Sequence, residues 1–308
     1  MIKKITFHFL LFYLFLLQSC WSSDPGASGS DILKSPIGVR PAALGGSYAA
    51  FGDDVYVIGY NPAGLARVSK YSLGLDHIEG YAGIETESLS VAIPTQSYGN
   101  IGGQIIYRHM PLIQNTLATD PAVSAYDIVV TVADAQQFGV IAIGGAVKTV
   151  FSNLGEKQAL SEALDLGFKI QFLDTDFAAV IQNVGPAVQY PNSPAQDPLP
   201  LTFRLGISRP LIVSPSSTLL ASVEGMNVLD DGNEASFGLE YWHRSILALR
   251  VGYHLTEQGN LNGGFSAGAG LRYNLGKLEY EIGFAWRPSQ ISQTFVTDSY
   301  IFGLLFWY

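Results

Sequence analysis

The sequence predicts an all-β protein, a transmembrane antiparallel β-barrel of about 14 strands with an N-terminal hatch or plug segment in its lumen. Three observations support this fold: alternation of apolar and polar residues from about Tyr71 onward, long and short connections that alternate in phase, and an aromatic final strand. A soluble β-sandwich also alternates, but it has no reason to keep long and short connections in phase over so many hairpins.

The first 22 residues have the layout of a secretory signal peptide. Lys3 and Lys4 precede an apolar run from about Ile5 to Leu17, and small residues follow it. The run is short for a membrane-spanning helix, which needs ~20 apolar residues. We therefore expect residues 1–22 to direct export.

Cys20 is a candidate lipidation site, because residues 17–20, LQSC, are similar to a relaxed bacterial lipobox. Ordinary cleavage nearby is the competing interpretation. Cys20 is the only cysteine, so no intrachain disulfide can form. The formal net charge is −9 and becomes −11 when Lys3 and Lys4 are removed, and no basic cluster remains. We therefore expect no nucleic-acid partner.

Residues 23–70 precede the strand pattern and are expected to form a linker followed by the hatch. The residues from 31 onward are rich in Gly and Ala, which allow a chain to pack closely against a wall. Asn61 can cap a short helical turn, and Pro62 suits its first position because proline has no N–H to leave unsatisfied. This step would form a rigid elbow where the hatch joins the first strand.

Residues 71–308 are expected to form the barrel. On the final strand, Tyr300, Phe302, Leu304, Phe306 and Tyr308 share one face. This pattern is similar to the C-terminal signal that the outer-membrane assembly machinery recognises, which makes that machinery and the lipid bilayer expected partners. The predicted strands lie near 71–79, 85–93, 99–110, 124–134, 138–151, 160–172, 176–183, 201–212, 217–226, 234–243, 246–255, 265–275, 278–287 and 298–308.

Long outer connections are expected at 111–123, 184–200, 256–264 and 288–298, and short periplasmic turns at 173–176, 244–245 and 276–277. A closed barrel leaves no unpaired strand edge in lipid. Fourteen strands enclose more room than side chains alone fill, so the lumen must be occupied or lined.

The hatch residues carry a family resemblance. The residues ALGGS at 43–47, Asp53-Asp54 and NPAGLA at 61–66 resemble the N-terminal signature of the FadL superfamily, and of its PorV/PorQ branch in particular. Weaker similarities follow at 178–187, 237–255 and 263–274, so that the resemblance covers nearly all of the chain after the leader. It implies a 14-stranded barrel with a hatch, through which a long-chain fatty acid or other hydrophobic compound diffuses passively across the bacterial outer membrane.

The resemblance also implies roles for particular residues. Asn61, Pro62 and Ala63 would lie in the hatch near the ligand path, and Gly45, Gly46, Asp53 and Asp54 would shape and anchor it. Lumenal Arg204, Arg250 and Arg272 are candidate partners for Asp53 and Asp54, or for a ligand carboxylate. A network of salt bridges in the lumen is the alternative for the arginines, and a purely structural cap is the alternative for residues 61–63.

The sequence departs from the long-chain fatty-acid transporters in its short outer loops, which puts the substrate in doubt. Gly102-Gly103 in the third strand would suit a bulge that opens a lateral gap, since paired glycines weaken a ladder. PorV itself is associated with type IX protein secretion, so a secretion component that binds cargo proteins is the alternative function. An acylated surface antigen without transport is a third.

No catalytic, metal or cofactor site is predicted. Outside the leader the histidines are widely spaced, and no cysteine remains to bind zinc. The acidic stretch at 229–234 lacks the length of a calcium loop and suits a hairpin turn better. No GxSxG motif occurs. The one enzymatic alternative is a lipase that combines a lumenal or rim serine with His254.

Overall fold

A computed structural model describes residues 28–35, 37–95, 99–111, 124–155, 157–191, 196–229, 231–256, 264–292 and 295–308. The predicted signal peptide and Cys20 lie outside these residues. No helix in the described part of the chain is long and apolar enough to cross a membrane.

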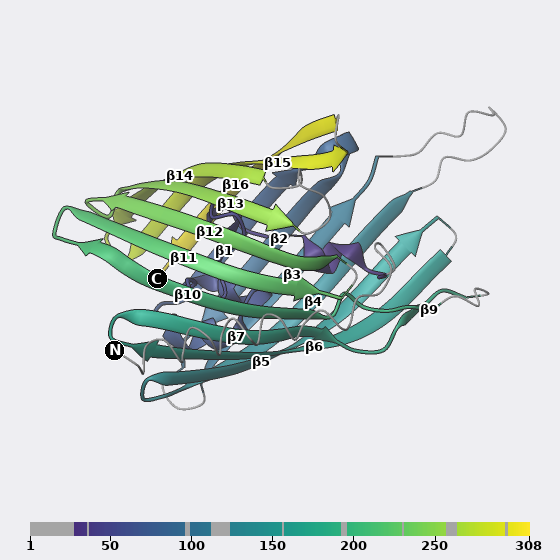
Figure 1. The fold of residues 1–308 in the computed structure, drawn as a ribbon, viewed down its shortest axis with the longest axis horizontal. Coiled ribbons are helices and arrows are strands. Elements are labelled where there is room, and N and C mark those ends of the chain that lie inside the picture. Colours follow the sequence, from purple (N-terminus) through teal and green to yellow (C-terminus); the bar gives the residue numbers. More distant parts are fainter. Residues whose placement is uncertain are drawn as a thin grey trace, which may run out of the picture.

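Fourteen antiparallel strands of the described chain close into one barrel, as the alternation predicted (Figure 1). Each strand pairs with its neighbours in sequence, except that β7 pairs with β10 and β1 closes against β16. The barrel strands are β1 (Ser72–Glu79), β2 (Glu85–Ile93), β3 (Asn100–His109), β4 (Ala125–Phe138), β5 (Ile141–Leu154), β6 (Lys157–Phe172), β7 (Thr175–Val184), β10 (Thr202–Val213), β11 (Ser217–Val228), β12 (Gly232–His243), β13 (Leu247–Thr256), β14 (Gly264–Leu275), β15 (Leu278–Ser292) and β16 (Phe295–Trp307).

The predicted short turns are confirmed. The connections at Leu173-Asp174 and Arg244-Ser245 place all four residues at positive φ, and Gly276 has φ +66°. Two consecutive residues with positive φ give a turn whose twist matches that of the flanking strands. We call the end of the barrel with the turns at Leu173, Arg244 and Gly276 the short-turn end, and the opposite one the long-connection end. At the long-connection end, β11 ends at Val228 and is joined by a short acidic connection to its antiparallel neighbour β12, which begins at Gly232 with φ +82°.

Two predictions about the wall are wrong. Residues 288–298 are not a loop, because β15 continues to Ser292 and β16 begins at Phe295, with the two paired up to these residues. Their polar composition hid the strands, since it lacks the apolar alternation of a lipid-facing segment. Gly102-Gly103 forms no bulge, because β3 pairs residue for residue with β2 and β4.

Gly102 has a packing role instead. A Cβ atom on it would lie 2.8 Å from side-chain atoms of Ile58 and Leu65. These residues belong to the inner segment, which we define as residues 31–68. The glycine thus lets that segment approach the wall closely, which is the other common reason for glycine in a strand.

The inner segment lies within the barrel (Figure 1). It begins near the long-connection end, where Gly29 donates its N–H to the carbonyl of Pro198, and it joins β1 at the short-turn end. It contains the short helix α2 (Val39–Ala43) and the 3₁₀ helices η2 (Asp31–Lys34), η3 (Val55–Gly59) and η4 (Pro62–Arg67). A second, two-stranded sheet of β8 (Val188–Gln189) and β9 (Gln196–Asp197) lies in the connection from β7 to β10.

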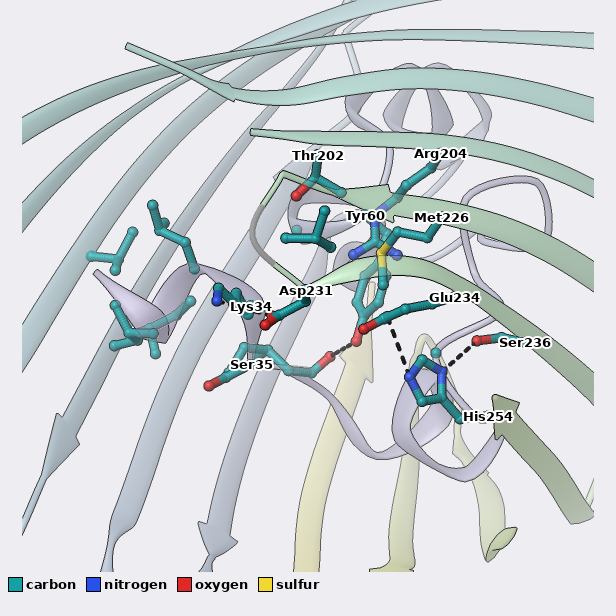
Figure 2. A pocket seen from close by; sticks show the side chains of 18 of the residues that line it. Lys34, Ser35, Tyr60, Thr202, Arg204, Met226, Asp231, Glu234, Ser236 and His254 are labelled. Carbon is teal, nitrogen blue, oxygen red and sulfur yellow. Dashed lines mark hydrogen bonds and ion pairs between the residues drawn. The ribbon is translucent and has the colours of Figure 1, made fainter. Parts of the chain in front are cut away.

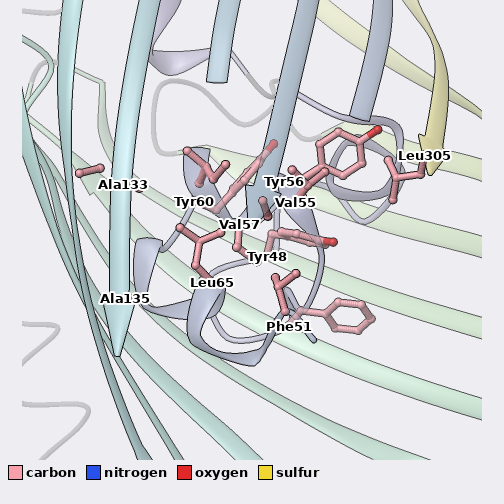
Figure 3. Close-up of a cluster of buried hydrophobic side chains, with 14 of the residues drawn as sticks. Tyr48, Phe51, Val55, Tyr56, Val57, Tyr60, Leu65, Ala133, Ala135 and Leu305 are labelled. Carbon is pink, nitrogen blue, oxygen red and sulfur yellow. The ribbon is translucent and has the colours of Figure 1, made fainter. Parts of the chain in front are cut away.

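The largest apolar core of the described chain is formed by the inner segment rather than by the wall. Tyr48, Tyr56, Ile58 and Leu65 are at most 2% exposed and pack with Phe51, Tyr60 and neighbouring side chains (Figure 3). On the outer face the opposite holds, since large apolar side chains such as Leu166 and Phe302 are at least half exposed. A barrel with this surface is suited to a lipid environment.

Candidate lumenal binding site

Arg40 is the central ion-pairing residue of the inner segment. Its guanidinium donates two hydrogen bonds of 2.8 Å to Glu240 on β12, and it contacts Asp53 at 2.6 Å and Asp54 at 3.0 Å. Charge-assisted, bidentate pairs of this kind are the strongest hydrogen bonds in proteins and fix geometry as well. Arg40 therefore ties the acidic pair of the inner segment to the barrel wall.

The ion-pair network continues along the wall toward the short-turn end. Glu240 also accepts from Arg250 at 2.7 Å, and Arg250 donates to Glu281 at 2.7 Å. Arg272 donates to the same Glu281 at 3.1 Å. Arg250 and Glu240 are at most 1% exposed. Such buried charges persist only when every one has partners.

This network differs from the predicted pairing. No direct ion pair joins Asp53 or Asp54 to Arg204, Arg250 or Arg272 within the described residues, and Arg40 takes that place. Arg250 and Arg272 instead belong to the lumenal salt-bridge network that was the alternative interpretation. The sequence analysis missed Arg40, although its position in a Gly- and Ala-rich lumenal segment was a usable signal.

Two wall carboxylates bind the backbone of the inner segment directly. Glu224 on β11 accepts the N–H groups of Tyr48 and Ala49 at 2.9 and 2.8 Å, and also pairs with Arg204 at 2.7 Å. On the other side of the lumen, Asp76 accepts from the backbone N–H of Val39 at 3.3 Å and from the Tyr56 hydroxyl at 2.7 Å. These contacts satisfy backbone and phenol groups that would otherwise be buried without partners.

Gly45 and Gly46 form a turn that lies against β13. Their φ values are +67° and +85°, a region that favours glycine. A Cβ atom on Gly45 would lie 2.9 Å from the backbone nitrogen of Tyr253, and one on Gly252 would lie 2.2 Å from that of Gly45. Two backbones approach here with no room for a side chain.

The Asn-Pro-Ala step begins η4 as the residue types predicted. The Asn61 side chain accepts the N–H of Ala63 at 3.0 Å, and Pro62 occupies the first turn. The Asn61 amide also donates to the carbonyls of Ala49 at 2.9 Å and of Phe168 on β6 at 3.3 Å. Asn61 thus joins two parts of the inner segment to the wall. These three residues do not line the cavity described next.

A cavity of about 330 Å³ lies in the lumen between the inner segment and the wall, toward the long-connection end (Figure 2). Its boundaries include η2, the turn at Gly46 and the ring of Tyr60. Apolar side chains cover part of it: Ile32, Leu33, Ile37, Ile106, Val129, Met226 and Val228. Titratable side chains also line it: Lys34, Lys148, Arg204, Asp231, Glu234, His254 and Arg287. A cavity of this size with an apolar part and a few polar groups has the usual form of a small-molecule site.

Arg287 differs from the other cationic groups of the cavity. Lys34 pairs with Asp231 at 2.9 Å, Lys148 with Asp165 at 2.7 Å, and Arg204 with Glu224. Arg287 has no hydrogen bond or ion pair within the part of the chain that the structure describes. Tyr60 and Glu234 line the same cavity and interact electrostatically with Arg287. Sequence reasoning missed this residue, which directly precedes the segment mistaken for a loop.

Three polar side chains of β12 and β13 form a second feature of the cavity wall. The Oγ atom of Ser236 lies 2.8 Å from Nδ1 of His254, and a Glu234 carboxylate oxygen lies 3.3 Å from Nε2 of the same ring (Figure 2).

Burial affects the titratable groups of the inner segment. It raises the pKa of the Asp54 carboxyl, an effect that the nearby Arg40 opposes. Burial likewise raises the pKa of the Tyr48, Tyr56 and Tyr60 phenols, which therefore remain neutral donors. Among the described residues, no three His, Cys, Asp or Glu side chains are grouped to hold a metal ion.

A comparison with known protein families finds a match in the first part of the chain. A model of an uncharacterised protein family, UPF0164, matches residues 26–167. No functionally curated protein matches the sequence significantly.

Several solved structures share the fold at low sequence identity. The toluene transporter TodX of Pseudomonas putida matches with a TM-score of 0.60 and 13% identity, over 93% of this chain and 98% of that one. The toluene transporter TbuX of Ralstonia pickettii matches with a TM-score of 0.59 and 15% identity, over 88% and 97%. A FadL homologue of Pseudomonas aeruginosa matches with a TM-score of 0.52 and 11% identity, over 87% and 98%. The chain therefore has the fold of FadL-type outer-membrane barrels.

Proposed function

We propose that this protein is a bacterial outer-membrane channel for the passive uptake of hydrophobic molecules that carry an acidic head group, such as long-chain fatty acids. Export by residues 1–22 and insertion by the assembly machinery through β16 belong to this proposal. The inner segment acts as the hatch, and the cavity beside it receives the ligand.

Arg287 is the observation that favours a ligand with an acidic head group. The similar structures include toluene transporters and a FadL homologue, and toluene is a neutral hydrocarbon that forms no ion pair with a cation. A lumenal guanidinium that forms no ion pair among the described residues is costly to bury, and a ligand carboxylate would offset that cost with charge-assisted hydrogen bonds. The neighbouring apolar side chains would contact the hydrocarbon body.

A matched pair of probes tests the proposal. Dodecanoate and dodecanol share one alkyl chain and differ in the head group, so the ratio of their affinities isolates the cation. We expect the purified protein to bind dodecanoate more tightly, and Arg287→Gln to remove roughly 10- to 100-fold of that preference, since a charged hydrogen bond contributes about 1.5–3 kcal/mol.

Arg209→Gln is the control, because Arg209 lies on the outer face of β10. It should leave both affinities unchanged. If the unaltered protein binds both probes equally, the ligand does not need an acidic head group. If it binds neither probe, uptake through this cavity is contradicted. Co-purification of an exported protein in place of a lipid would favour the secretion alternative.

A further inference from the structure

We propose that Ser236, His254 and Glu234 form a hydrolytic site that cleaves carboxylic esters of hydrophobic molecules within the lumenal cavity. The sequence analysis predicted no catalytic site and named a serine acting with His254 only as an alternative. The inference rests on one part of the proposed function, namely that an amphiphile can reach the cavity.

The strand register brings the three side chains together. Ser236 on β12 is paired directly with His254 on β13, and Glu234 precedes Ser236 by two residues. Residues two apart in a strand share a face, so all three side chains project into the lumen. Their placement on two paired strands of the wall is more rigid than placement on a loop.

The hydrogen-bonding groups suit nucleophile, base and orienting acid. With its proton on Nε2, the His254 ring has a free Nδ1 that accepts from Ser236 at 2.8 Å, while Nε2–H points toward Glu234, 3.3 Å away. Relative to the triad of the serine proteases, the two ring nitrogens are exchanged. Base catalysis requires only that one ring nitrogen accept the serine proton while the N–H of the other donates to a carboxylate that orients the ring.

The surroundings favour the reaction. The His254 and Glu234 side chains are only 11% and 12% exposed, which strengthens electrostatic interactions between them. A Cβ atom built on Gly46 would come no closer than 4.0 Å to its nearest neighbour, the Ser236 Oγ atom, so space remains beside the nucleophile. Arg287 lines the same cavity, so the site also contains a cation of the kind that stabilises a developing oxyanion.

The reaction is balanced with water as the only co-reactant. The Ser236 oxygen forms a bond to the ester carbonyl carbon while His254 takes the hydroxyl proton. The carbon–oxygen bond to the alcohol then breaks, and His254 returns the proton to the leaving alcohol. Water then attacks the acyl carbon while His254 takes one of its protons, the bond between that carbon and the Ser236 oxygen breaks, and His254 returns the proton to Ser236. The products are an alcohol, a carboxylate and a proton released to solvent, and the carboxylate is the ligand class assigned to Arg287.

Hydrolysis of p-nitrophenyl octanoate by the full protein, purified in a detergent that lacks ester bonds, tests the proposal. We expect Ser236→Ala and His254→Gln each to lower the rate by at least about 10²-fold, the usual contribution of a positioned base. Ser222→Ala is the control, because Ser222 is an equally buried lumenal serine on β11 that bonds a backbone carbonyl rather than a histidine. It should keep the full rate.

A fluorophosphonate probe supplies a test that needs no variant. The unaltered protein should gain one adduct, located on Ser236 by peptide mass spectrometry. Glu234→Gln should lower the rate and Glu234→Asp should retain more of it, because only a carboxylate stabilises the positively charged ring that forms when His254 takes the Ser236 proton.

Two outcomes would overturn the inference. The first is that the unaltered protein releases p-nitrophenol no faster than Ser236→Ala. The second is that the probe labels a different serine and leaves Ser236 unlabelled. Dodecanoate binding separates this inference from the proposed function. If binding persists while hydrolysis and labelling are absent, uptake stands and the hydrolytic site fails.

Discussion

The two halves of the lumen differ in how completely their charges are paired. Toward the short-turn end, Arg40, Glu240, Arg250 and Glu281 form a continuous network of ion pairs beside the largest apolar core. Toward the long-connection end, a cavity of about 330 Å³ remains, and Arg287 projects into it without an ion pair among the described residues. This difference fits the proposed function, in which the first half is a closed barrier and the second receives the ligand.

The largest effect is expected from Arg40→Met, which removes the cation shared by three carboxylates. Removing one partner of a buried pair costs about 3–5 kcal/mol, because a buried charge is left uncompensated. The measurements are the thermal unfolding temperature and ion conductance in planar bilayers. We expect the unfolding temperature to fall and the conductance to rise as the barrier loosens. An unchanged conductance would show that the ion pairs do not keep the lumen closed.

The effect of Arg40→Met should depend on pH with a defined sign. Burial raises the pKa of Asp54 in the folded protein, so the charged form of Asp54 is the costly one. That cost is absent at low pH and develops as the pH rises through the folded pKa. The loss of stability should therefore shrink as the pH is lowered, and a loss that grows instead would exclude Asp54 as its source.

A smaller effect is expected from Gly252→Ala, which places a methyl group where the backbones of Gly45 and Gly252 meet. Overpacking of this kind costs about 1–3 kcal/mol. We expect faster hydrogen exchange in the turn at Gly45 and Gly46. Gly139→Ala is the comparison, because nothing lies within 4 Å of its Cβ position and only the strain of its positive φ remains. Equal effects of the two substitutions would contradict the packing argument.

The smallest effect is expected from Lys70→Gln. Lys70 pairs with Glu279 at 2.6 Å, but its side chain is 52% exposed. Exposed pairs contribute about 0–1 kcal/mol, and salt screens them. The unfolding temperature should hardly change, and a loss as large as that of Arg40→Met would show that burial does not explain the difference between the two pairs.

The sequence predicted the wall better than its contents. Alternation along a strand depends only on neighbouring residues, so the strands and the short turns at Leu173 and Arg244 could be found locally. The cap formed by Asn61 and Pro62 is local as well. The pairing of Arg40 with Glu240 joins residues 200 positions apart, and it depends on how the inner segment lies in the barrel.

The two wrong predictions about the wall also arose because contacts between residues distant in the sequence cannot be read from a local pattern. Polar residues beyond Arg287 continue β15 although they lack the apolar pattern. Gly102 has its partners, Ile58 and Leu65, in the inner segment, so its role in packing could not be read from β3 alone. The cluster of Ser236, His254 and Glu234 depends on the register between β12 and β13, although His254 had been noted in the sequence.

The central claim, that an acidic amphiphile occupies the long-connection half of the lumen, is tested most directly with a photoreactive fatty acid that carries a diazirine on its chain. Ile105 and Ile106 are adjacent on β3, but Ile105 is 45% exposed on the outer face whereas Ile106 is 7% exposed and lines the cavity. Peptide mass spectrometry after illumination distinguishes them. The account predicts crosslinks at Ile106 and Met226 that excess dodecanoate prevents. Crosslinks confined to Ile105 and other outward side chains would contradict it.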